Sequence, residues 1–129
     1  MALASAVPGR SQPNTFFGTD LWAGFMRNYQ GNTPQFVRLV ITSGTSTSGE
    51  VTVPQQGLVF PFAVAAFSNT VVDLPLAQVM NFGSETIGDR GVHVTALDPV
   101  SVVAVNYEGY TADAANILPV HVLGSVYRV

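Results

Sequence analysis

The chain of 129 residues contains no cysteine and carries a net charge of −3, with only 10% charged residues. These values exclude a disulfide framework and a cysteine-bound zinc site, and the lack of a basic cluster excludes an electrostatic nucleic-acid surface. The length is typical of one domain, which we place at residues 16–129 behind an N-terminal arm of residues 1–15. No stretch reaches the roughly 18 apolar residues that a transmembrane helix needs.

Strands dominate the expected secondary structure, because apolar and polar side chains alternate along most of the chain. The expected strands, in chain order, are TDLWAGFMR, FVRLVITS, GEVTVP, LVFPFAVAA, NTVVDLP, GVHVTAL, PVSVVAVNY and the final segment Gly124–Val129. Their short length and the turn residues between them predict an all-β fold, an antiparallel β-sandwich of seven or eight strands. Pro61 lies inside one strand and places that strand at a sheet edge or at a bulge. The pair Asp98-Pro99 suits a type I turn that would join the two strands around it.

One short helical turn is expected at residues 112–118, where Asp113 would cap it and Pro119 would end it. Trp22 is expected in the core, since a lone tryptophan on a strand usually fills the space between two sheets.

Adjacent phenylalanines raise the question of what covers them. Phe16 and Phe17 point to opposite faces of an extended chain, so one of them lies outside the core unless another segment covers it. Phe60, Phe62 and Phe67 raise the same question to a lesser degree. The covering groups would come from the N-terminal arm or from another subunit.

The sequence offers few groups for catalysis. His93 and His121 are its two histidines, and each is flanked by valines, as is typical of a hydrogen-bonded structural histidine. Ser101 and Asp98 are near His93 in the sequence, but nothing places the serine on the strained turn that presents a nucleophile. We therefore expect no enzymatic activity.

The carboxylates are scattered and form no EF-hand pattern. Glu85 and Asp89, in the loop SETIGDRG, could hold calcium together with neighbouring carbonyl oxygens, since calcium accepts mixed oxygen ligands. A solvated turn is the simpler interpretation, so we expect no cofactor and keep calcium as the alternative.

Two parts of the chain are candidates for binding other molecules. The segment ITSGTSTSGE predicts a loop or long hairpin tip, because so many Ser, Thr and Gly residues cannot bury one face. Its candidate ligand-binding residues are Thr42, Ser43, Thr45, Ser46, Thr47 and Ser48. The ends of the predicted domain are candidates for self-assembly, because a terminal strand needs a partner and the chain has none of the lysines that usually protect strand edges. These candidate residues are Phe16, Phe17, Val126, Tyr127, Arg128 and Val129.

Five stretches, GTDLWAGF, LVITS, GEVTVP, GVHVTALDPVSVVAVN and TADAANILPVHVLGSVYRV, follow one another in an order that resembles the N-terminal region of IgGFc-binding-protein-like domains. The resemblance covers residues 18–129. Its distinctive part is the tail with Leu118-Pro119, Leu123-Gly124 and Tyr127. It implies an extracellular β-rich module of secreted mucin-associated proteins or bacterial surface and adhesin-like proteins, without catalytic residues. Larger members continue past this tail, and residues 1–15 match nothing in the family.

Two functions remain open at this point. The low charge, the missing lysines and the terminal strand favour an extracellular or cell-surface structural module that associates with copies of itself by strand addition. The Ser/Thr-rich segment and the resemblance favour a monomeric adhesin-type module that binds a protein or glycan ligand. The composition fits both a neutral exterior and an exterior buried against other molecules.

Overall fold

The computed structural model describes residues 16–28 and 35–126. Nine strands lie in these ranges: β1 (Gly18–Ala23), β2 (Phe25–Met26), β3 (Phe36–Ser43), β4 (Thr47–Val53), β5 (Leu58–Val64), β6 (Ser68–Leu74), β7 (Met80–Asn81), β8 (Val92–Glu108) and β9 (Thr111–Ile117). Three helical turns accompany them: η1 (Pro54–Gln56), α1 (Leu76–Val79) and η2 (Val120–Val122). The predicted all-β class is thereby confirmed.

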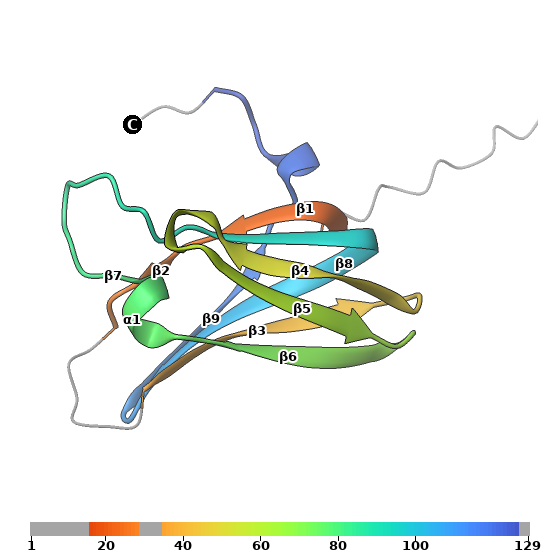
Figure 1. The fold of residues 1–129 in the computed structure, drawn as a ribbon, viewed down its shortest axis with the longest axis horizontal. Helices are drawn as coiled ribbons and strands as arrows, with labels where there is room; N and C mark the ends of the chain where they lie inside the picture. Colours follow the sequence, from red (N-terminus) through yellow and green to blue (C-terminus); the bar gives the residue numbers. More distant parts are fainter. Residues whose placement is uncertain (1–15, 29–34, 127–129) are drawn as a thin grey trace, which may run out of the picture.

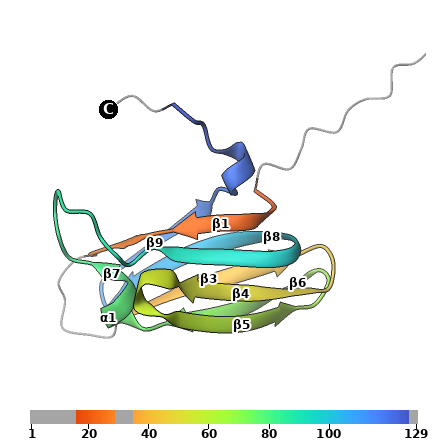
Figure 2. The same ribbon diagram turned by 45° about the horizontal axis from the view of Figure 1, so that its top comes forward.

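The seven longer strands form one antiparallel sheet that folds into two layers, because β8 belongs to both (Figure 1). The first part of β8 pairs with β1 and β4, and its second part pairs with β3 and β9. Since β5 adds to β4 and β6 adds to β3, the layers are β1-β8-β4-β5 and β9-β8-β3-β6. Figure 2 shows β4 and β5 in front of β3 and β6. The short strands β2 and β7 pair in parallel as a small second sheet.

The core lies between the two layers and consists of alternate residues of each strand. Its fully buried members include Leu21, Val37, Leu39, Ile41, Val51, Val53, Val92, Val94, Val100 and Val102. Because successive side chains of a strand point to opposite faces, a shift of one residue in any of these strands would expose its whole apolar set. The valine-rich alternation in the sequence therefore fixes the register of both layers.

β8 corrects the turn that the sequence predicted at Asp98-Pro99. The chain stays extended through this pair and passes from one layer to the other. The hairpin between β3 and β4 supplies hydrogen bonds at the crossing: the Asp98 N–H donates to Thr47 Oγ1 (3.0 Å), and Ser43 Oγ donates to the Pro99 carbonyl oxygen (3.2 Å). These bonds hold the extended backbone at a proline that cannot donate to a ladder.

Two further expectations about the C-terminal part are wrong. The helical turn predicted at residues 112–118 is the strand β9, because each of its residues pairs with the second part of β8. A turn of 3₁₀ helix, η2, instead follows Pro119. Gly124–Val126 form no strand, so the expected terminal strand is absent from its described half, and Tyr127, Arg128 and Val129 lie outside the described residues, as does the arm of residues 1–15.

The expected burial of Trp22 is also wrong. Leu21 is fully buried opposite Val94, whereas Trp22 points outward and is 48% exposed. Ala23 and Phe25 are buried like Leu21, so the odd-numbered residues of this segment face the core.

Among the other aromatic residues, Phe60 and Phe62 pack with the core, while Phe67 stands exposed at the corner between β5 and β6. Pro61 lies on β5, which among the described strands pairs with β4 alone, and this confirms the predicted edge position.

Candidate functional site

The Ser/Thr-rich segment, which the sequence predicted as a loop or long hairpin tip, is the short hairpin between β3 and β4. Thr42 and Ser43 end β3, Thr47 and Ser48 begin β4, and only residues 44–46 connect the two strands. Three hydroxyls of the segment bond to backbone groups of the protein itself. These bonds are Ser43 Oγ to the Pro99 carbonyl oxygen (3.2 Å), the Ala66 N–H to Ser46 Oγ (3.1 Å) and the Asp98 N–H to Thr47 Oγ1 (3.0 Å).

Within the described residues, the hydroxyls of Thr42, Thr45 and Ser48 have no hydrogen-bond partner. The Thr45 N–H donates to Ser43 Oγ (3.2 Å), which closes the connection locally. Half of the candidate ligand-binding hydroxyls are therefore engaged in holding the hairpin, and the rest are spread over two strands and their connection.

Three of the candidate self-assembly residues, Phe16, Phe17 and Val126, lie within the described ranges. Phe16 is exposed and Phe17 is half-buried just before β1. Gly18 packs against η2, since a Cβ at this position would lie 2.9 Å from Pro119 Cγ. Pro119 also forms an isolated antiparallel β-bridge with Leu21. The structure thus places the start of β1 beside η2, and Val126 is highly exposed four residues after η2 ends.

A feature that the sequence analysis missed is the free edge of β9. This strand pairs with β8 along one edge, and no described strand pairs with the other. Its residues Thr111–Asn116 are all exposed. They include no proline, lysine or arginine, and Asp113 is the one charged residue among them that could oppose strand addition at this edge. The alanine-rich sequence concealed this edge, because it suggested a helix.

The other edges of the two layers are better protected. The edge of β1 is covered by the Leu21–Pro119 bridge and by η2. β5 contains Pro61, which lacks an N–H, and β5 and β6 lie beside each other where both layers end (Figure 1). Among the described strands, β9 is consequently the one best suited to accept a further strand.

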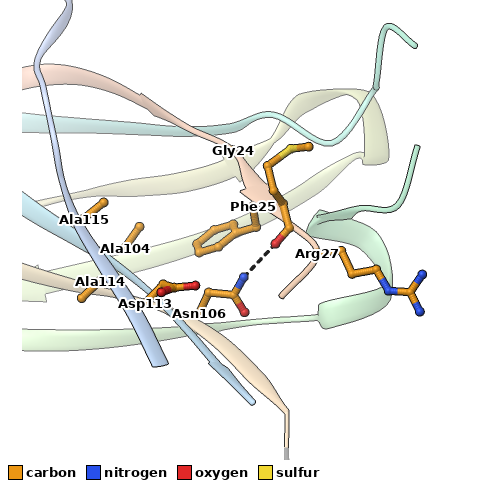
Figure 3. Close-up of a pocket in the computed structure, with 9 residues that line it drawn as sticks. Gly24, Phe25, Arg27, Ala104, Asn106, Asp113, Ala114 and Ala115 are labelled. Carbon is orange, nitrogen blue, oxygen red and sulfur yellow. Dashed lines mark hydrogen bonds between the residues drawn. The ribbon is translucent and has the colours of Figure 1, made fainter. Parts of the chain in front are cut away.

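A hollow of about 250 Å³ adjoins β9 on the inner side of its sheet. Its lining residues are Gly24, Phe25, Met26, Arg27, Ala104, Asn106, Asp113, Ala114 and Ala115. Figure 3 shows the Phe25 ring pointing toward β8 and β9, while the Arg27 side chain points away. Asn106 Nδ2 donates to the Met26 carbonyl oxygen (2.8 Å) and so ties β2 to β8 at one end of the hollow. Apart from Arg27, Asn106 and Asp113, the lining residues are apolar or small, so the hollow suits a mainly apolar side chain.

The outward face of the same layer is poor in charge. Its central row is Val71, Val40 and Val103, which lie side by side on β6, β3 and β8. The Arg38–Asp73 ion pair (2.9 Å) is next to this row, with the Arg38 guanidinium 4.1 Å from the Phe36 ring centroid. The low charge of the chain thus leaves the centre of this sheet face apolar and partly exposed.

His93, which the sequence placed near Asp98 and Ser101, has Asp20 as its carboxylate partner instead. His93 Nε2 lies 2.7 Å from Asp20 Oδ1, and its ring stacks on Trp22. Ser101 is on the other part of β8, where it pairs with Thr42 of β3. The described residues contain no group of three or more His, Asp or Glu that could hold a metal ion. Asp89 instead accepts a hydrogen bond from Gln56 Nε2 at Oδ2 (3.0 Å).

Comparison with known proteins gives no match: no family model, no curated protein and no solved structure resembles the chain closely enough to place it. In the described ranges, every helix is too short to cross a membrane.

Proposed function

We propose that the protein is a non-catalytic structural module that self-associates, with a segment of one copy adding as a strand to the free edge of β9 in the next. The observation that carries this proposal is the combination of a free edge, on which Asp113 is the one charged residue, with an adjoining hollow. In recognition by strand addition, backbone hydrogen bonds supply affinity and side-chain pockets beside the edge supply specificity.

The backbone contribution comes from the seven residues of β9. Alternate residues of an antiparallel strand direct their N–H and C=O groups to the same side, so about half of them are available to an incoming strand. Each such hydrogen bond adds about 0.5–1.5 kcal/mol after the loss of bonds to water. The small side chains of Ala112, Ala114 and Ala115 allow a neighbouring strand to approach without steric conflict.

The side-chain contribution comes from the hollow between Phe25 and Ala115. Successive residues of an added strand point to opposite faces, so every second side chain would enter this space. The segment Val126–Val129 is a suitable occupant, because Tyr127 and Val129 would share one face. Gly124–Val126 are exposed and belong to no strand, and the chain leaves the sandwich after η2 (Figure 1).

A donor segment and an acceptor edge on different parts of the same copy make a head-to-tail contact. Such a contact produces a ring if the rotation closes and an open filament if it does not. An extracellular or cell-surface location agrees with the resemblance to IgGFc-binding-protein-like domains, and both belong to this proposal. A monomeric adhesin that uses the Thr42–Ser48 segment is less favoured, because three of its hydroxyls already bond to the protein backbone.

Light scattering after size exclusion tests the proposal. The full-length chain should elute as assemblies well above its monomer mass of 13.6 kDa. Ala115→Arg, which fills the hollow with a charged side chain, should give a folded monomer, as should a chain that ends at Ser125. Asn69→Arg adds the same charge to an exposed position of β6 and is the matched control, which should still assemble. A full-length monomer at high concentration would refute the proposal.

Cross-linking tests which surfaces meet. The chain has no cysteine, so one protein with Ala114→Cys and another with Tyr127→Cys can be mixed with a short bis-maleimide. Strand addition predicts a heterodimer band that requires both proteins. Cross-linked dimers of either protein alone, with no additional product on mixing, would show that assembly uses other surfaces.

A further inference from the structure

The outward face of the first layer carries a fixed, half-exposed aromatic side chain. Trp22 lies opposite His93 in the β1–β8 register, and the two rings stack with centroids 4.1 Å apart and an interplanar angle of 10°. Asp20 Oδ1 holds His93 Nε2 at 2.7 Å. Trp22 is nevertheless 48% exposed. One part of the indole is therefore oriented by the protein, while another part faces solvent in a conformation that exists before any ligand arrives.

A hollow of about 210 Å³ lies next to this tryptophan, at the end of the layer where β4 stops and β8 begins. Its lining residues are Trp22, Pro54, Gln55, Gly88, Asp89 and Gly91. A Cβ on Gly91 would already contact Trp22 Cζ3 at 3.6 Å, so a longer side chain there would compete with the indole. The two glycines and the proline thus leave open the space that the aromatic ring borders.

Polar groups of defined orientation complete the hollow. Asp89 Oδ2 accepts a hydrogen bond from Gln56 Nε2 at 3.0 Å, which fixes the carboxylate without using all of its acceptor positions. Gln55 adds an exposed amide, which both donates and accepts. An apolar plane beside a carboxylate and an amide matches a sugar ring, whose axial C–H groups form a flat apolar face and whose hydroxyls form hydrogen bonds at the rim.

Charge and size narrow the class of sugar. Arg90 Nε lies 3.8 Å from Asp89 Oδ1 and offsets part of the negative charge of that carboxylate. Asp20, beside His93, and Glu50 lie on the same outward face, and the chain carries a net charge of −3, so the surroundings still favour a neutral sugar over an anionic one. The hollow is smaller than the roughly 300–1,000 Å³ of typical small-molecule sites, so it accommodates one ring rather than a chain.

We propose that Trp22, Gln55 and Asp89 form a shallow binding site for one ring of a neutral oligosaccharide. The site lies outside the Ser/Thr-rich segment and away from the β9 edge. It requires neither self-association nor the head-to-tail contact, so failure of either proposal leaves the other standing.

Intrinsic fluorescence tests this site directly, because Trp22 is the chain's single tryptophan. Titration with cellotetraose and with chitotetraose should change its emission in a saturable way, and should protect it from acrylamide quenching. A hyaluronan tetrasaccharide, which carries carboxylates, should bind at least about tenfold more weakly. Absence of any change with both neutral sugars up to about 20 mM, well above the millimolar Kd that a single stacked ring supports, would overturn the proposal.

Variants distinguish this hollow from other surfaces. Gln55→Ala and Asp89→Asn should each lower the affinity for the better neutral sugar by about five- to tenfold, the loss expected for one hydrogen bond. Asn69→Ala, on β6, is the matched control and should bind as the parent does. Trp22→Ala, followed by calorimetry because it removes the fluorophore, should lose at least about fivefold. Equal affinities for the Gln55, Asp89 and Asn69 variants would place binding elsewhere and refute the assignment.

Discussion

Gly49 on β4 provides a sharp test of the packing between β4 and β8. It lies opposite Ala96 on β8 and opposite Phe62 on β5. A Cβ at this position would lie 2.8 Å from Ala96 Cα and 2.8 Å from Phe62 Cζ, and it would be closer still to the Thr95 carbonyl oxygen. Two of these three atoms belong to the backbone, so rotation of a side chain cannot relieve the overlap. The strands must separate where the β4–β8 ladder begins.

We expect Gly49→Ala to lower the free energy of unfolding by about 3 kcal/mol, at the upper end of the range for overpacked sites. For a domain of this size the loss corresponds to a fall in Tm of roughly 10 °C. Urea denaturation followed by far-ultraviolet circular dichroism measures the change. Gly44→Ala is the matched control: no atom lies within 4 Å of its Cβ position, so the variant should keep or slightly increase stability. Equal midpoints for the two variants would refute the close contact between β4 and β8.

Three further substitutions test the register, a buried hydroxyl and a surface ion pair. Leu21→Ala should lower the free energy of unfolding by about 3 kcal/mol and Trp22→Ala by only about 1 kcal/mol, since the first side chain is fully buried and the second is half-exposed. Thermal denaturation that gave the reverse order would mean that β1 has the opposite register. Ser43→Ala should cost about 1–2 kcal/mol in urea denaturation, because it removes the donor to a backbone carbonyl at a buried position; an unchanged midpoint would argue against that bond. Asp73→Asn, which breaks the exposed pair with Arg38, should change stability by less than about 1 kcal/mol, and the difference should vanish in high salt.

The sequence was sufficient to predict the strands but not how they connect. β8 is the clearest case, because a local pattern, Asp98-Pro99, suggested a turn inside what is one strand of 17 residues. The signal that could have corrected this is the parity of the apolar residues. Val92 and Val94 before the pair have the same parity as Val100 and Val102 after it, and an uninterrupted strand needs this continuity while a turn does not.

β9 illustrates how tertiary context overrides local propensity. An alanine-rich segment with aspartate near its start and proline after its end satisfies every local criterion for a helical turn. The segment is extended because the second part of β8 would otherwise have an unpaired edge. This requirement comes from the pairing partner, β8, and not from the local sequence of β9. The candidate acceptor edge was therefore hidden from sequence analysis, even though the general expectation of strand addition did not depend on it.

Trp22 was misplaced for a related reason. The tendency of tryptophan to be buried outweighed the alternation of Leu21, Ala23 and Phe25, which puts Trp22 on the opposite side. That alternation was present in the sequence and would have indicated an exposed aromatic side chain. A large aromatic residue at a position that the pattern assigns to solvent is a more informative signal than one that fills a core.

Assembly through the β9 edge would affect how strongly the hollow beside Trp22 binds a polysaccharide. Trp22 faces outward from the first layer. The β9 edge lies in the second layer, and the hollow beside it is lined by the inward-facing Phe25. Strand addition at β9 would thus leave the hollow beside Trp22 uncovered in every copy. A single shallow site that holds one sugar ring is weak, but copies joined in an assembly present many such sites to the same polysaccharide. Linked sites of this kind can exceed the affinity of one site by about 10²–10⁴ without any new contact, provided that their geometry allows simultaneous binding. Self-association would then convert a weak contact into firm attachment, so an assembly-deficient variant such as Ala115→Arg would retain its affinity for a tetrasaccharide while losing its retention on the insoluble polymer.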